Sequence, residues 1–136
     1  MKSIFTTLLV LCAIAINAQF ANYYDPSNWT EAHSSGCDNG YADASGAPAS
    51  VTIVGSENPG CGGSIVSYGI TVAICGTVSF DWLYTTDDCD GSFYDPFGYY
   101  LNGIPTQLSV NGHPDGSSQS GSVSIAVNVG DVVAFY

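Results

Sequence analysis

Apolar residues alternate with small or polar residues along three segments of this chain, and this alternation constrains the fold more than any other feature. A spacing of two places the apolar side chains on one face of an extended strand. The residues between them are mostly Ser, Thr, Gly, Ala and Asp, a pattern typical of antiparallel sheets with one face on a core and the other in water. The alternating residues are Val66, Tyr68, Ile70, Val72 and Ile74; Val78, Phe80, Trp82 and Tyr84; and Val123, Ile125, Val127 and Val129.

Turn signals separate the segments. Asn102-Gly103, Asn111-Gly112 and Gly130-Asp131 are dipeptides that favour tight turns between strands. No stretch beyond the first 18 residues carries a sustained helical period. We therefore predict an all-β fold, an antiparallel β-sandwich of jelly-roll or CUB-like type. The expected strands span residues 50–55, 65–74, 77–85, 97–102, 106–110, 121–129 and 132–136.

Residues 1–18 have the composition of a secretory signal peptide. Lys2 supplies the positive n-region, an apolar run covers residues 4–16, and Ala18 precedes the expected cleavage point. The run is shorter than the ~20 residues that a spanning helix needs. We therefore expect a secreted or cell-surface protein without membrane insertion.

Removal of this leader would leave an acidic chain with no Lys or Arg. The sequence holds 12 Asp and Glu against a single Lys, and its formal net charge is −11. Nucleic-acid binding requires cationic side chains that displace phosphate counterions, and phosphate sites use Lys or Arg in the same way. The composition therefore argues against nucleic-acid and nucleotide partners.

Residues 19–49 lack the alternation and contain Trp29 as their one large apolar anchor. We interpret them as a lead-in segment that packs along the edge of a sandwich domain formed by residues 50–136. An apolar strand is predicted up to the last residue, Tyr136, whereas termini usually lie at the surface. We expect the sandwich to be incomplete at its C-terminus, with further domains of the same polypeptide after it. The alternative is a true terminus tucked into the sheet.

Four cysteines follow the leader, and an even number in a small exported domain is typical of two disulfides. The strand predicted between Cys75 and Cys89 separates them by roughly 30 Å, which is beyond disulfide reach. The strand before Cys75 runs away from Cys61 and the next strand returns, so Cys61 and Cys89 share one end. We therefore predict Cys61–Cys89 and Cys37–Cys75 disulfides. Pairing Cys37 with Cys89 is disfavoured by the same argument, and pairing it with Cys61 would leave two free thiols.

Four aspartates are concentrated in the loop between two predicted strands. Ca²⁺ takes six to eight oxygen ligands, so the loop is a candidate for an irregular calcium site that lacks the EF-hand spacing. The alternative is a hydrated acidic loop that keeps the protein soluble. The candidate metal ligands are Asp87, Asp88, Asp90 and Asp95.

Aromatic residues are concentrated in and after the same loop. Phe93, Tyr94 and Tyr100 are candidates for an exposed ligand-binding surface, because sugar C–H faces stack on rings while Asp and Asn bond the hydroxyls. Four neighbouring aromatic residues follow the period of two, and we expect them to face the core. They are Trp82, Tyr84, Phe97 and Tyr99.

No catalytic constellation stands out in the sequence. His33 lies in the lead-in segment and His113 in a turn, and neither belongs to a recognised nucleophile motif. No G-x-S-x-G elbow occurs, and the aspartates of the loop do not define a carboxylate pair for glycoside hydrolysis. We therefore expect a chain without enzyme activity.

Five motifs carry a resemblance to a known family: CGTVSFDWLYTTD at 75–87, YDPFGY at 94–99, LNG at 101–103, QSGS at 119–122 and VNVGD at 127–131. Together they resemble a secreted bacterial domain of large modular surface proteins, where it occurs beside HYR or other immunoglobulin-like repeats and, in Bacteroidota, ahead of a type IX secretion sorting domain. The resemblance covers about residues 28–136 and implies a CUB-like sandwich that acts in adhesion or interaction, with an extracellular glycan or protein surface as partner. It transfers no catalytic residue. The alternative function is a carbohydrate-binding module of a secreted glycan-degrading protein.

Overall fold

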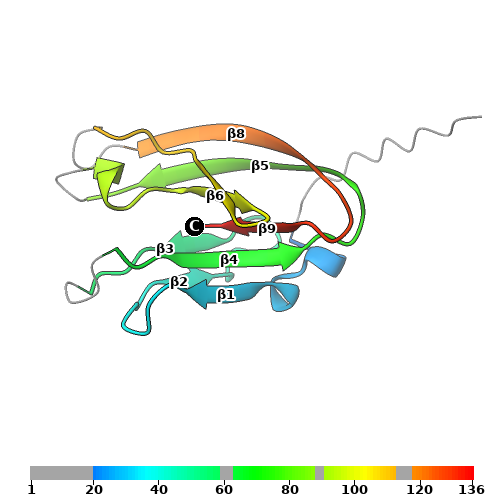
Figure 1. Cartoon of the computed structure of the whole chain (residues 1–136), viewed down its shortest axis with the longest axis horizontal. Helices are drawn as coiled ribbons and strands as arrows, with labels where there is room; N and C mark the ends of the chain where they lie inside the picture. The colour runs from blue at the N-terminus through cyan, green and yellow to red at the C-terminus, as the bar shows by residue number, and fades with distance from the viewer. Residues whose placement is uncertain (1–19, 59–62, 88–90, 113–117) are drawn as a thin grey trace, which may run out of the picture.

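Antiparallel strands make up the architecture of the chain (Figure 1). The computed structural model describes residues 20–58, 63–87, 91–112 and 118–136. The signal peptide predicted at residues 1–18 lies outside them. The strands are β1 (Thr30–His33), β2 (Tyr41–Asp43), β3 (Thr52–Val54), β4 (Val66–Thr71), β5 (Gly76–Thr85), β6 (Gly98–Leu101), β7 (Ile104–Gln107), β8 (Ser118–Val127) and β9 (Val132–Phe135); short 3₁₀ turns are η1 (Asn22–Tyr24), η2 (Pro26–Asn28) and η3 (Gly91–Phe93).

Two layers form the sandwich. The larger layer is a five-stranded sheet in the order β1-β4-β9-β6-β7, and the second layer is the long β5–β8 pair. Strands β2 and β3 form a separate small ladder. The core between the layers joins Val72 and Val133 of the first layer to Ile125 and Val127 of β8. The all-β sandwich predicted from the sequence is confirmed.

Burial follows the alternation along the long strands. Val66, Tyr68 and Ile70 of β4 are buried while their neighbours are not, and β5 alternates between half-buried and exposed residues over its whole length. Two members of the apolar sets depart from the pattern. Ile74 and Val129 are exposed, because they lie beyond the ends of β4 and β8, where the chain has left the sheet.

The Asn102-Gly103 turn joins β6 and β7 by a two-residue loop. Leu101 pairs with Ile104, and both turn residues have positive φ, 53° at Asn102 and 79° at Gly103. Positive φ at both positions defines a type I′ turn, whose twist matches that of the flanking strands. Because the turn is so short, β7 occupies residues 104–107, and the strand predicted at 106–110 was placed too late.

The N-terminal segment contributes two strands that the alternation did not reveal. β1 pairs with β4 and becomes an edge of the large sheet, although all four of its residues are exposed. Trp29 precedes it and stacks against Tyr68 and Phe135, with ring centroids 5.2 and 5.6 Å apart. The division into a lead-in segment and a sandwich domain stays a prediction, as does the incompleteness expected after Tyr136.

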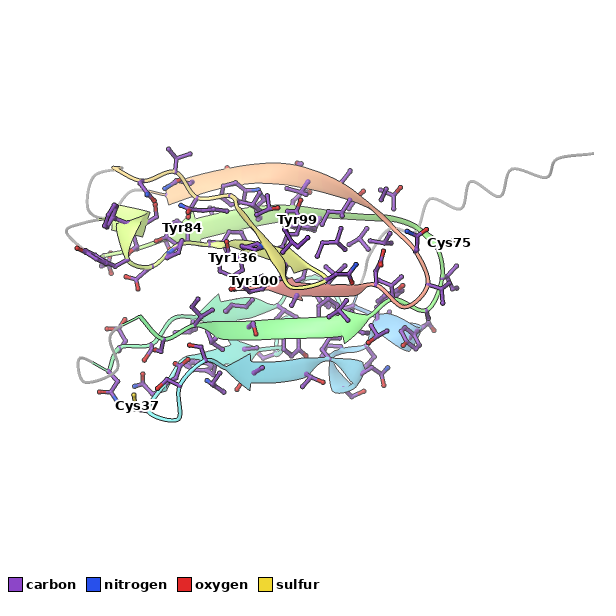
Figure 2. The ribbon with its side chains drawn as sticks, viewed as in Figure 1. Cys37, Cys75, Tyr84, Tyr99, Tyr100 and Tyr136 are labelled. Atoms are coloured by element: carbon purple, nitrogen blue, oxygen red, sulfur yellow. The ribbon has the colours of Figure 1, made fainter. Side chains whose placement is uncertain are left out.

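Cys37 and Cys75 lie at opposite ends of the sandwich (Figure 2). Because β1 runs antiparallel to β4, the chain leaving β1 carries Cys37 to the end where β4 begins, whereas Cys75 follows the end of β4. Cys75 is a free, exposed thiol. The Cys37–Cys75 disulfide predicted from the sequence is therefore wrong. Cys61 and Cys89 lie outside the described residues, and their pairing stays a prediction.

Candidate functional site

The turn between β5 and β6 carries two exposed aromatic rings. Phe93 is 58 % exposed and Tyr94 is 67 % exposed, and the rings meet edge to face with centroids 4.8 Å apart. Gly91 begins the turn with a φ of 62°, a conformation that L side chains rarely adopt. We call residues 91–95 the aromatic turn. It projects two large apolar groups into solvent at one end of the sandwich.

Ser92 anchors the aromatic turn from within. Its side chain is fully buried, and its hydroxyl donates to the carbonyl of Val110 at 2.9 Å. Gln119 also binds the backbone of Val110. Its side-chain oxygen accepts from the Val110 N–H at 2.6 Å, and its side-chain NH₂ group donates to the Val110 carbonyl at 3.1 Å. Because the buried Ser92 hydroxyl has a hydrogen-bond partner, it holds the aromatic turn near its centre.

A second group of polar side chains braces the segment beneath this anchor. Gln107 donates to the side-chain oxygen of Asn111 at 2.9 Å and to the carbonyl of Ser109 at 2.8 Å. Ser109, itself buried, accepts from the backbone N–H of Phe97 at 2.8 Å. These bonds tie the chain after β7 to the chain before β6, so the support of the aromatic turn is cross-linked by amides and hydroxyls.

The far side of the aromatic turn is held by Tyr84 of β5. Its hydroxyl donates to the backbone carbonyl of Asp95 at 2.8 Å, and its ring stacks on Phe97 at 6.4 Å. Trp82 also contacts Phe97, with ring centroids 5.6 Å apart and the planes tilted by 42°. Trp82, Tyr84, Phe97 and Tyr99 are all half-buried. The turn is therefore fixed at Ser92 and at Asp95, on either side of the exposed rings.

Tyr100, the third aromatic candidate from the sequence, belongs to a different place. It is half-buried on β6 and its ring contacts Tyr136 at a centroid distance of 4.5 Å (Figure 2). Its neighbour Tyr99 packs on the core between the layers, so Tyr100 faces away from that core. The structure thus brings Phe93 and Tyr94 together and leaves Tyr100 apart from them. A ligand-binding role for any of the three stays a prediction.

Two of the four predicted calcium ligands can be placed. Asp87 and Asp95 are exposed on the two sides of the loop, whereas Asp88 and Asp90 lie outside the described residues. Within the described part of the chain, no group of three or more His, Cys, Asp or Glu side chains could hold a metal ion. The calcium site stays a prediction.

Sequence reasoning missed a charged cluster on β1 and the loop after it. Nε2 of His33 lies 2.9 Å from Glu31, and Nδ1 lies 3.3 Å from Asp38, whose side chain has no exposed surface. The Gly40 N–H donates to the other carboxylate oxygen of Asp38 at 2.8 Å. The Ala42 N–H donates to the Glu31 carboxylate oxygen that does not contact His33, at 2.6 Å. The available signal was the Glu-x-His spacing, which places both side chains on one face of a strand.

Electrostatics within this cluster favour its charged forms. The hydrogen bond that His33 donates to the Glu31 carboxylate raises the pKa of His33; burial opposes this effect, and Asp38 adds to it. The N–H of Gly40 lowers the pKa of Asp38, against the effect of burial, and His33 lowers it further. In a chain that has no Lys or Arg after Lys2, the raised pKa of His33 favours its protonated form between these two carboxylates.

Comparison with protein-family models, curated proteins and solved structures finds no match to this chain. The resemblance to a CUB-like domain of bacterial surface proteins therefore stays a prediction. None of the helices in the described ranges has the length and apolar character needed to cross a membrane.

Proposed function

We propose that this chain is a non-catalytic adhesion or interaction module of a secreted or cell-surface protein, and that the aromatic turn is its contact surface. The observation that supports this proposal is the pair of exposed rings of Phe93 and Tyr94 on a turn anchored by buried Ser92. Aromatic anchors supply much of the energy of protein recognition. A support that is already ordered loses little conformational entropy on binding.

A carbohydrate-binding module is the second candidate, and the composition of the loop favours it. The ring faces of Phe93 and Tyr94 suit the C–H faces of sugars, and the exposed carboxylates of Asp87 and Asp95 suit their hydroxyl groups. The two candidates share one contact surface and differ in the partner. The identity of the ligand that binds therefore distinguishes the two candidate functions.

The charge of the chain restricts the partner in either case. With a net charge of −11, the chain repels polyanions such as acidic or sulfated glycans and nucleic acid. Neutral glycans and protein surfaces with a neutral or basic character are the compatible partners.

A binding screen with matched variants tests the proposal. The wild-type chain, the double variant Phe93→Ala/Tyr94→Ala and the control Tyr41→Ala would be applied to a glycan array and to immobilised extracellular matrix proteins. Tyr41 is also exposed, at 51 %, but lies on β2 outside the aromatic turn. We expect the double variant to lose at least about tenfold in affinity while the control retains wild-type binding.

Two results would contradict the proposal. One is the absence of binding to every neutral glycan and protein surface. The other is equal binding by the wild-type chain and the double variant. Signal confined to neutral glycans would identify a carbohydrate-binding module, and signal confined to proteins would identify a protein-interaction module.

A further inference from the structure

An apolar cavity lies between the two layers at the end of the sandwich opposite the aromatic turn. Its walls include Thr77, Val78 and Phe80 from the first half of β5, whereas Tyr84 near the end of β5 holds the aromatic turn. The cavity itself has a volume of about 50 Å³, and its mouth opens to solvent.

The walls of this cavity are almost entirely hydrocarbon. Ile70, Val133 and Phe135 form the side that belongs to β4 and β9, and Val127 of β8 joins the β5 residues on the opposite side. Thr77 contributes the only hydroxyl from a strand. A polar ligand would leave water without gaining hydrogen bonds from these walls, and that exchange costs free energy.

The N-terminal segment closes one side of the cavity with aromatic rings. Phe20, Tyr24 and Trp29 line it, and the ring centroids of Phe20 and Trp29 are 5.4 Å apart. The indole N–H of Trp29 donates to the carbonyl of Tyr24 at 3.0 Å, so the only polar atom of this side chain is already satisfied. The surface that Trp29 offers to the cavity is therefore carbon.

Three hydrogen bonds join residues 20–29, which carry these rings, to other parts of the chain. Tyr23 donates its hydroxyl to the carbonyl of Thr71 at 3.1 Å, and Tyr68 donates its hydroxyl to the carbonyl of Pro26 at 2.7 Å. The Phe20 N–H bonds the carbonyl of Pro48 at 3.2 Å. The aromatic wall is thus fixed by its ends, while Ile74, 52 % exposed, stands at the rim of the cavity.

We propose that this cavity binds the ring or chain of one small, neutral, apolar molecule, aromatic or aliphatic, that inserts past Ile74 and fills the mouth with the rest of its surface. Cavities lined by aliphatic and aromatic side chains stay dry and accept such guests. An anionic guest would face the net charge of −11, and a cationic guest would find no carboxylate among the lining residues. This site is separate from the aromatic turn, and its ligand differs in class from a glycan or a protein surface.

Titration with a neutral fluorescent probe tests the proposal. N-phenyl-1-naphthylamine would be added to the purified chain, with 8-anilinonaphthalene-1-sulfonate as its anionic counterpart. We expect saturable binding of the neutral probe at one molecule per chain, and binding of the anionic probe at least tenfold weaker.

A pair of matched variants separates the cavity from the rest of the surface. Ile74→Trp narrows the mouth and should weaken probe binding at least tenfold. Leu83→Trp makes the same kind of exchange at an exposed position of β5 that does not line the cavity, and should leave probe binding unchanged. Both positions are exposed, so the fold should tolerate both changes.

Methyl NMR supplies a readout that does not depend on the variants. On addition of the probe, the methyl resonances of Ile70 and Val133 should shift, while those of Leu83 and Ile104 should not. The proposal is overturned if the probe does not saturate, if both variants bind it equally well, or if the shifts fall on the exposed methyl groups instead.

Discussion

The aromatic side chains at the two ends of the sandwich point in opposite directions. At the aromatic turn, Phe93 and Tyr94 point into solvent above a buried polar support. At the cavity end, Phe80 and Phe135 point inward from the sheets, and Trp29 closes the side as part of the N-terminal segment. Outward rings on a fixed turn suit contact with another surface, whereas inward rings around a void suit a small apolar guest.

The difference follows from what fills the space under each end. Serine, glutamine and asparagine side chains cross-link the segments below the aromatic turn, so its backbone is held by hydrogen bonds. At the cavity end, apolar side chains of β4, β5, β8 and β9 and aromatic side chains of the N-terminal segment surround an open space. Hydrogen bonds between side chains hold the end with the aromatic turn, whereas at the other end the side chains leave a cavity between the layers.

The largest effect should come from Trp29→Ala at the cavity end. Loss of the ring that stacks on Tyr68 and Phe135 should lower the free energy of unfolding by about 3 kcal/mol and abolish probe binding. Urea denaturation measures the first effect. Phe93→Ala, which removes an exposed ring from the other end, should change stability by no more than about 0.5 kcal/mol. Equal losses in the two variants would remove the contrast between the ends.

Calcium should act at the end with the aromatic turn and leave the cavity unchanged. If the loop that holds Asp87 and Asp95 binds Ca²⁺, a hundredfold excess over Kd adds about 2.7 kcal/mol of stability. For a domain of this size, that raises the melting temperature by several degrees relative to EDTA. Asp87→Asn should reduce the rise. A flat response in millimolar Ca²⁺ would leave this loop a hydrated acidic surface.

A smaller effect is expected from Ser92→Ala beneath the aromatic turn. The change removes the contacts of the Ser92 hydroxyl with the Val110 carbonyl at 2.9 Å and with the side-chain oxygen of Asn111 at 3.3 Å, while the Val110 carbonyl keeps its donor from Gln119. The free energy of unfolding should fall by about 1 kcal/mol. Ser120→Ala, at an exposed position of β8, is the control and should be neutral. A neutral Ser92→Ala would contradict the role given to the buried anchor.

The smallest effect concerns pH and His33. Because the folded state raises the pKa of His33, the cluster stabilises the fold fully below the unfolded value of about 6.5 and loses this contribution as pH rises through the raised pKa. The melting-temperature gap between the wild-type chain and His33→Gln should be largest below the unfolded pKa of about 6.5 and should close as the pH rises through the raised pKa. A gap that widens with rising pH would reverse the assigned sign.

Much of the fold was predictable because the long strands bury every second residue. The period of two located β4, β5 and β8, and Asn102-Gly103 marked the hairpin that the structure contains. β1 escaped prediction because all its residues are exposed, so its place depends on backbone pairing with β4 rather than on side-chain pattern. That missing strand also explains the wrong pairing of Cys37 with Cys75.

The candidate site was predictable only in part. Phe93 and Tyr94 stood out because they break the alternation, and both are exposed. Tyr100 could not be separated from them by sequence, because the side of the sheet it occupies depends on the register with β9. The Ser92 anchor and the cavity both depend on residues distant in sequence, and neither leaves a local pattern.

The most direct test of two distinct sites is a crossed binding measurement. The wild-type chain, Phe93→Ala/Tyr94→Ala and Ile74→Trp would each be assayed for binding to the extracellular surface selected in the screen and to N-phenyl-1-naphthylamine. The account predicts that the double variant loses surface binding and keeps the probe, while Ile74→Trp loses the probe and keeps surface binding. The account would be contradicted if either variant lost both surface binding and probe binding. It would also be contradicted if both variants kept both kinds of binding.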